Sequence, residues 1–168
     1  MPTLNAMYVG IDPGANGGLA LTQGTVVIEW AEMPRLDRDL LNLLRQWKEE
    51  YEPEFCCLEK VNSMPGEGHV GAFSFGEGFG KLQMALAAVE LPYELVTPRV
   101  WQKGLGVKVK EKSESKKDFK ERLRHLAIQL FPSEPLWDKP KTLGKQRAVC
   151  DAMLIAEYCR RKCQGIIS

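Results

Sequence analysis

Apolar residues in the first part of the chain form short runs or alternate with polar residues, a pattern typical of β-strands. Residues 7–11 are an apolar run that ends at Asp12, and residues 17–22 and 25–30 form two further runs. The Gln-Gly pair at 23–24 favours a hairpin turn between the last two runs. The pattern therefore predicts three consecutive antiparallel strands at the start of the chain.

A helical pattern follows these strands and leads to a fourth extended run. After Pro34, apolar residues recur at helical spacing, with Asp37 in the position of an N-cap and Pro53 beyond the end. These apolar positions are Leu36, Leu40, Leu43, Leu44 and Trp47. Residues 55–61 are almost continuously apolar, as in a buried strand. Because a helix precedes this strand, we expect it to run parallel to its neighbour.

The middle of the chain is rich in glycine and predicts irregular backbone from 62 to 80. Phe73 and Phe75 lie in this segment, where their rings could stack on unpaired bases or anchor the loop in the core. Residues 81–89 predict a helix whose small residues permit close approach of a second helix, in this chain or across a dimer. Residues 92–97 predict another short strand.

The last third of the chain predicts two helices joined by a polar linker. The first carries Lys116 near its start and ends before Pro132, the linker spans 133–145, and the second helix runs from about 147 to 162. The order of elements predicts a single α/β domain over residues 1–168. Its mixed five-stranded sheet has three antiparallel strands followed by parallel strands, and helices flank it.

Composition is that of an ordinary globular domain, with 44% hydrophobic and 27% charged residues in 168. No run approaches the roughly 18 apolar residues of a membrane span, and the first residues lack a signal-peptide pattern, so we expect an intracellular protein without a membrane partner. Five cysteines form no zinc pattern with His69 and His125, which favours reduced thiols.

Charge is divided unevenly along the chain. Residues 1–98 carry 6 Lys and Arg against 14 Asp and Glu, whereas residues 99–168 carry 17 against 8. A basic run of this kind is commonly a solvated surface, but beside an acidic metal site it would suit a phosphate backbone. The candidate phosphate-binding residues are Lys103, Lys108, Lys110, Lys112, Lys116 and Lys117.

Three acids occupy positions where a carboxylate needs a partner. Asp12 ends the first strand beside a glycine-rich turn, where it could cap the turn or face a cation. Glu59 ends the fourth strand, and in a parallel pair it would lie beside Asp12, with a divalent cation or a surface lysine to offset its charge. Asp151 lies in the first turns of the last helix, where the helix dipole favours a carboxylate.

The segments GIDPGANGGLAL, CLEKV and CDAMLIAEY, with VTPRVWQKGLG between them, resemble the motifs of RuvC-type Holliday-junction resolvases, closest to their phage and chloroplast branch. The resemblance implies a ribonuclease H-like fold and a homodimer that cuts four-way DNA junctions by symmetric nicks with magnesium or manganese. It implies that Asp12, Glu59 and Asp151 are catalytic metal ligands. It further implies that Lys103 and the pair at 116–117 bind phosphate.

One position departs from that family. Relatives carry a further acid or a histidine three or four residues before the last Asp, where this chain has Ala148 and Arg147. The second ion could be held weakly without a fourth ligand, Glu134 or Asp138 could supply one, or Arg147 could contact the phosphate directly.

The chemistry expected from these residues is hydrolysis of a phosphodiester with two Mg²⁺ ions, for which Mn²⁺ may be exchanged, since acid-only ligands favour hard cations. The products would be 5′-phosphate and 3′-hydroxyl ends. Two alternatives remain from the sequence: a nuclease of the same fold acting on other branched DNA or RNA–DNA hybrids, and a catalytically impaired junction-binding protein.

Overall fold

The computed structural model describes residues 5–60, 68–139 and 142–167 and contains a mixed five-stranded sheet in the order β3-β2-β1-β4-β5. The strands are β1 (Met7–Asp12), β2 (Gly18–Gln23), β3 (Val26–Glu32), β4 (Phe55–Glu59) and β5 (Tyr93–Val96). Strands β1 to β3 pair antiparallel, and β4 runs parallel to both β1 and β5. The predicted sheet is confirmed.

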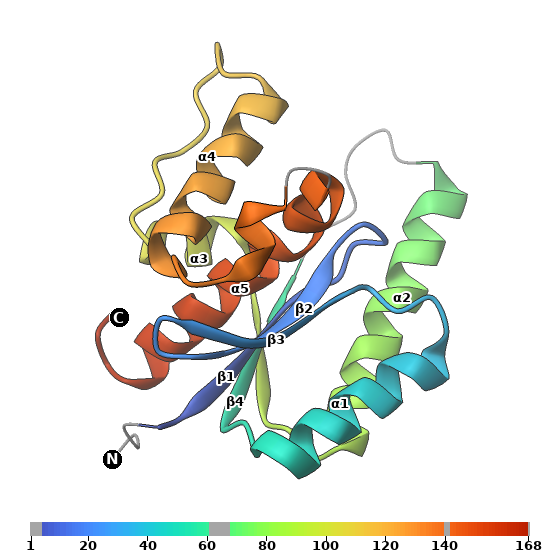
Figure 1. Ribbon diagram of the computed structural model, residues 1–168. Coiled ribbons are helices and arrows are strands. Elements are labelled where there is room, and N and C mark those ends of the chain that lie inside the picture. Colours follow the sequence, from blue (N-terminus) through green and yellow to red (C-terminus); the bar gives the residue numbers. More distant parts are fainter. Residues whose placement is uncertain (1–4, 61–67, 140–141, 168) are drawn as a thin grey trace.

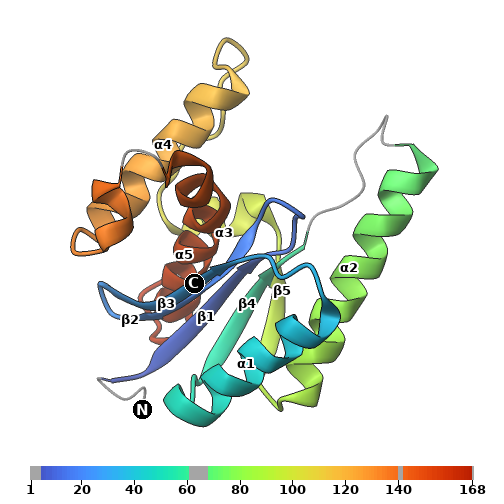
Figure 2. The ribbon, with the colours of Figure 1, turned by 45° about the vertical axis from the view of Figure 1, so that its right-hand side comes forward.

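Helices cover both faces of this sheet (Figure 1). The helices are α1 (Asp37–Tyr51), α2 (His69–Ala88), α3 (Pro98–Gly104), α4 (Lys116–Leu130), the 3₁₀ helix η1 (Pro135–Asp138) and α5 (Leu143–Cys163). Helices α1 and α2 pack on one face, and α3, α4 and α5 pack on the other. Figure 2 shows α2 and α4 rising on either side of the turn between β1 and β2.

Alternation along β1 decides which residues meet which layer. Val9 and Ile11 belong to the core shared with α1 and α2, and Tyr8 belongs to the core shared with α5. Gly10 lies on the α5 side, where a Cβ atom would come within 2.1 Å of the carbonyl oxygen of Ala152. Helix α5 therefore lies directly against β1, closer than any side chain larger than hydrogen allows.

The prediction of irregular backbone up to residue 80 is wrong for residues 69–80, which form the first part of α2. Residues 62–67 of that prediction lie outside the described residues. The glycines that suggested a loop occupy an exposed helix surface, and Cβ atoms at Gly71, Gly76, Gly78 and Gly80 would meet nothing within 4 Å. Helix α2 forms because Phe79, Leu82 and Leu86 pack on the core at helical spacing.

Two helix starts also differ from the prediction. The N-cap of α1 is Leu36, which makes no side-chain cap hydrogen bond, and Asp37 is the first helical residue. Helix α5 begins at Leu143, so Asp151 lies two turns inside it and not at its start. The helix dipole acts within the first turn. It therefore does not explain the position of Asp151.

The segments around the basic run contain more structure than the pattern suggested. The predicted polar linker includes η1, whose Leu136 is buried against residues of α5. Lys103 belongs to the last turn of α3 and not to the loop that follows. Both elements are too short for hydrophobic periodicity to reveal them. Within the described residues, no helix combines the length and hydrophobicity that crossing a bilayer requires.

Candidate active site

Asp12 and Glu59 end adjacent parallel strands on the same face of the sheet. The register pairs Ile11 of β1 with Leu58 of β4, so the next residues are Asp12 and Glu59. Both acids follow the alternation that directs Cys57 and Tyr8 towards α5. The structure therefore places these two carboxylates side by side, as the sequence predicted from parallel pairing.

Asp151 approaches the pair from α5. Its side chain is only 6% exposed, and α5 is held close to β1 by the contact at Gly10. Burial, followed by the charge of Asp151, raises the pKa of Asp12 to about 6. Burial, followed by the charge of Asp12, raises the pKa of Glu59 to about 7. The three acids thus form one electrostatic cluster whose negative charges oppose one another.

Neighbouring groups fix the orientation of the two strand-end carboxylates. The backbone N–H of Gly14 donates to Asp12 Oδ1 at 3.2 Å. The indole N–H of Trp101 in α3 donates to Glu59 Oε2 at 2.5 Å, and the Trp101 ring is fully buried. A buried charge-assisted hydrogen bond of this kind restricts the carboxylate to one orientation.

Lys120 of α4 lies among the three acids. Its Nζ forms an ion pair and hydrogen bond with Asp151 Oδ2. Burial by itself lowers the pKa of Lys120, but attraction to Asp151, with smaller contributions from Asp12 and Glu59, reverses this effect and raises it. The lysine is therefore a charged ammonium that partly offsets the cluster.

An open pocket of about 930 Å³ lies next to Asp12. It is lined by the turn at 14–17, by the cations of Arg35, Lys120 and Arg147, and by Glu32. The exposed Arg147 also pairs with Glu121 Oε1 at 2.9 Å. Asp12, one member of the carboxylate cluster, thus faces a space bordered by three cations, an arrangement suited to a phosphate group.

The three carboxylates suit a divalent cation by their chemistry, but their arrangement in this structure is not a ready metal site. Carboxylate oxygens are the ligands that Mg²⁺ and Mn²⁺ prefer. Burial, followed by repulsion between the acids, raises the pKa values of Asp12 and Glu59, and a bound cation would oppose this effect. In arrangement, no group of three or more His, Cys, Asp or Glu among the described residues forms a ready metal site. The ligand atoms are therefore of the type that a hard cation prefers, but Asp151 is ion-paired with Lys120.

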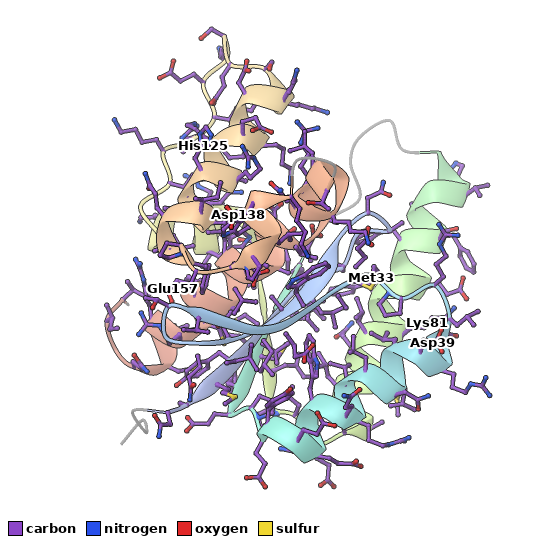
Figure 3. All side chains as sticks on the ribbon, in the orientation of Figure 1. Met33, Asp39, Lys81, His125, Asp138 and Glu157 are labelled. Atoms are coloured by element: carbon purple, nitrogen blue, oxygen red, sulfur yellow. The ribbon has the colours of Figure 1, made fainter. Side chains whose placement is uncertain are left out.

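Among the described residues, neither the turn of α5 before Asp151 nor the two candidate acids Glu134 and Asp138 adds a fourth ligand to the cluster. Ala148 is buried one turn before Asp151. Glu134 accepts hydrogen bonds from Trp30 Nε1 at 3.3 Å and from the backbone of η1. Asp138 is exposed in η1, among the elements on the α5 side of the sheet (Figure 3). Neither acid contacts the cluster here.

The six predicted phosphate-binding lysines are all exposed. Lys103 lies in the last turn of α3, the pair at 116–117 begins α4, and the other three lie in the connecting loop at 105–115. This loop is attached to α4, since Arg122 makes hydrogen bonds to both carboxylate oxygens of Glu114 and to the carbonyl of Lys108. Their contact with DNA stays a prediction.

The aromatic residues Phe73 and Phe75 do not lie on a loop. Phe73 is 74% exposed on α2, and Phe75 stacks on Phe79 with ring centroids 6.2 Å apart. Phe79 in turn packs against the core. Their stacking on bases stays a prediction, now from a helix surface.

Sequence reasoning assigned no role at the acidic cluster to Trp101 or Lys120. Trp101 stands in the motif VTPRVWQKGLG, where a tryptophan beside basic residues was a usable signal. Lys120 follows Lys116 by one helical turn and was counted only as part of the basic run. Its contact with Asp151 depends on how α4 packs against α5.

The arrangement of strands and helices is a ribonuclease H-like fold, as the sequence predicted. No protein-family model and no curated protein matches the chain. Among solved structures, RuvC of Thermus thermophilus in complex with a Holliday junction substrate is similar over 96% of this chain and 98% of that chain, with a TM-score of 0.67 and 14% identity. A second structure of Thermus thermophilus RuvC is similar with a TM-score of 0.62 and 15% identity, over 96% of this chain and 98% of that chain. The predicted resemblance in fold to RuvC resolvases is confirmed.

Proposed function

We propose that this protein is a metal-dependent endonuclease that resolves four-way DNA junctions by paired nicks. The observation that carries the proposal is the convergence of Asp12, Glu59 and Asp151 at one end of the sheet, each from a different segment. The similarity of the fold to RuvC, which has been solved with a Holliday junction substrate, supports the choice of substrate.

In this proposal the three carboxylates hold the divalent cation, Mg²⁺ by preference and Mn²⁺ as a substitute. When bound, such a cation stabilises charge on a phosphoryl oxygen and lowers the pKa of a bound water. The number of two ions stays a prediction from the sequence. The overall reaction adds water across the P–O3′ bond and leaves 5′-phosphate and 3′-hydroxyl ends.

The chain's own residues orient the reacting groups. Trp101 keeps one oxygen of Glu59 in a fixed direction, and Gly14 does the same for Asp12. Arg35, Lys120 and Arg147 surround the adjacent pocket, where they would attract a phosphate and hold it near the acids. The exposed lysines from 103 to 117 would contact phosphates further along the arms of the junction.

A homodimer belongs to the proposal because symmetric nicks need two acidic clusters. One chain supplies a single cluster of this kind among its described residues. Two copies related by a two-fold axis would match the symmetry of a four-way junction.

Two observations favour the second candidate, a junction-binding protein with impaired catalysis. Lys120 engages Asp151, and Ala148 stands where relatives have a ligand. Such a protein would bind the same junction without cutting it, so a cleavage assay separates this candidate from the first.

The test is the substitution Asp12→Asn, with Asp39→Asn as matched control. Asp39 is an exposed acid on α1, remote from the cluster (Figure 3). With Mg²⁺, the wild-type protein and the control are expected to nick a labelled four-way junction in preference to a linear duplex or an RNA–DNA hybrid. Asp12→Asn should reduce the cleavage rate roughly 100-fold or more, as expected on removing a group that supports transition-state charge.

Binding of the junction, measured by gel shift without metal, should survive Asp12→Asn. Equal loss of binding and cleavage would contradict the assignment of Asp12 to catalysis. Absence of cleavage by the wild-type protein at any Mg²⁺ or Mn²⁺ concentration, with binding intact, would establish the junction-binding candidate.

A further inference from the structure

Lys120 is the one cation in direct contact with the acidic cluster among the described residues. Its Nζ is paired with Asp151, and Asp12 and Glu59 also attract it. We propose that the cluster takes one divalent cation and that the Lys120 ammonium supplies the second positive charge, next to Asp151. This inference rests on the proposed nuclease function and changes the expected number of ions.

The first argument is that Lys120 is held in place by the elements around it. Glu121, the next residue on α4, pairs with Arg147 of α5 at 2.9 Å and with Arg124 at 3.0 Å. Arg124 in turn donates to Gln146 Oε1 at 3.0 Å. These contacts join α4 to α5 in the turn of α4 that follows Lys120, so its position beside Asp151 follows from the packing of two helices.

The second argument is that the turn of α5 before Asp151 carries no carboxylate or imidazole that could hold a second ion. Ala148 presents a methyl group one turn before Asp151, and Arg147 is a cation engaged by Glu121. A divalent cation held by Asp151 alone on that side would have few protein ligands. The ammonium of Lys120 already occupies the place next to Asp151 Oδ2.

The third argument is the balance of charge. Three carboxylates, one divalent cation and one ammonium sum to zero. A second divalent cation would leave one surplus positive charge in place of the ammonium, and two surplus charges beside it. Buried charges are stable when they are paired, so the first combination is favoured before a phosphate arrives.

The fourth argument is access to the substrate. The Lys120 side chain is 50% exposed and lines the pocket next to Asp12. An ammonium has three hydrogen-bond donors, so Lys120 can hold Asp151 and still donate to a phosphate oxygen in the pocket. It would thereby stabilise negative charge on the phosphate without taking up or releasing a proton.

The test counts bound Mn²⁺ directly, by electron paramagnetic resonance of the free ion during titration of the protein without DNA. One Mn²⁺ per wild-type chain supports the proposal. Two Mn²⁺ per wild-type chain overturn it while leaving the nuclease function intact. No bound Mn²⁺, together with no junction cleavage, overturns the proposed function and this inference with it.

The second readout is single-turnover cleavage by Lys120→Gln and Lys120→Arg, with Lys162→Gln as the matched control. Lys162 is also paired with a carboxylate, Glu94, at the far end of α5. Lys120→Gln should cleave roughly 100-fold more slowly, Lys120→Arg should recover at least a tenth of the wild-type rate, and the control should be unchanged.

Unfolding by urea shows whether each variant is folded. If Lys120→Gln fails to fold, Lys120→Arg decides instead, because arginine keeps the charge. At least a tenth of the wild-type rate then supports the inference, and a larger loss in folded Lys120→Arg overturns it. Full activity of folded Lys120→Gln would overturn the inference.

Discussion

Two segments of this protein are rich in glycine, and the surroundings of their glycines differ: the first segment is tightly packed and the second is exposed. Between residues 10 and 18, added Cβ atoms at Gly10, Gly17 and Gly18 would come within 2.1, 2.4 and 2.5 Å of neighbouring atoms. Between residues 71 and 80, the glycines of α2 have open space around them. Glycine content alone predicts irregular backbone for both segments, and only the first needs glycine for its packing.

The difference lies in what surrounds each segment. Gly10 contacts α5, Gly18 contacts the backbone of β3 and α5, and Gly17 contacts Asp12. These approaches bring β1, α5 and the acids together. In α2 the glycines lie on an exposed surface, where they make the helix less stable than alanine would. The first segment therefore builds the site, and the second only lowers the stability of a helix.

The largest effect of a substitution is expected from Gly10→Ala. The new methyl group would lie 2.1 Å from the Ala152 oxygen and 2.3 Å from the Ala156 nitrogen, and backbone atoms of a packed helix cannot turn aside. We expect a loss of about 3 kcal/mol in the free energy of unfolding, measured with urea. Stability equal to that of wild type would show that α5 does not rest on β1 as described.

An effect of similar size is expected from pH, because the first segment also buries Asp12. The pKa of Asp12 is raised to about 6 and that of Glu59 to about 7, above values of about 4 in an unfolded chain. Between pH 4 and pH 7 the folded protein therefore binds more protons than the unfolded chain. The contribution of these two groups to stability is fully present below pH 4 and is lost as the pH rises through 6 and 7.

Urea unfolding with a chelator present should accordingly show a decrease of about 4 kcal/mol between pH 5 and pH 8. Asp12→Asn removes one of the two groups and should make the decrease smaller. A stability that rises over this range in wild type would contradict the burial of uncompensated carboxylates. Added Mg²⁺ should stabilise the protein most at pH 8, where the acids are ionised.

The smallest effect, with opposite sign, is expected from Gly76→Ala and Gly80→Ala. Both positions are helical and have no neighbour within 4 Å of an added Cβ atom. Each substitution should raise the free energy of unfolding by about 0.5–1 kcal/mol. If either substitution destabilises the protein, the open surface assigned to this part of α2 is wrong.

Strand alternation and parallel pairing were sufficient to predict most of the site. Asp12 and Glu59 follow from a two-residue period, a helix between the strands and the place where each strand ends. Asp151 was predicted from its place in the last helix and from the resemblance, but the helix dipole offered as the reason does not apply two turns into α5. Its position follows from the contact of α5 with Gly10.

Lys120 and Trp101 could not be assigned from local pattern. An amphipathic helix with many lysines gives no local sign of which lysine faces another helix, because that depends on the packing of α4 against α5. Trp101 lies in a seven-residue helix, too short for periodicity to show that its ring is buried and its N–H directed at Glu59. Phe73 and Phe75 were misplaced because glycine content outweighed the apolar spacing of α2.

The three carboxylates come from residues 12, 59 and 151, and the third is carried by the last helix of the described chain. Asp12 and Glu59 precede α5 in the chain, so the strands that carry them are synthesised before the helix that carries Asp151. An activity that needs all three acids is therefore absent from any translation product that ends before residue 151.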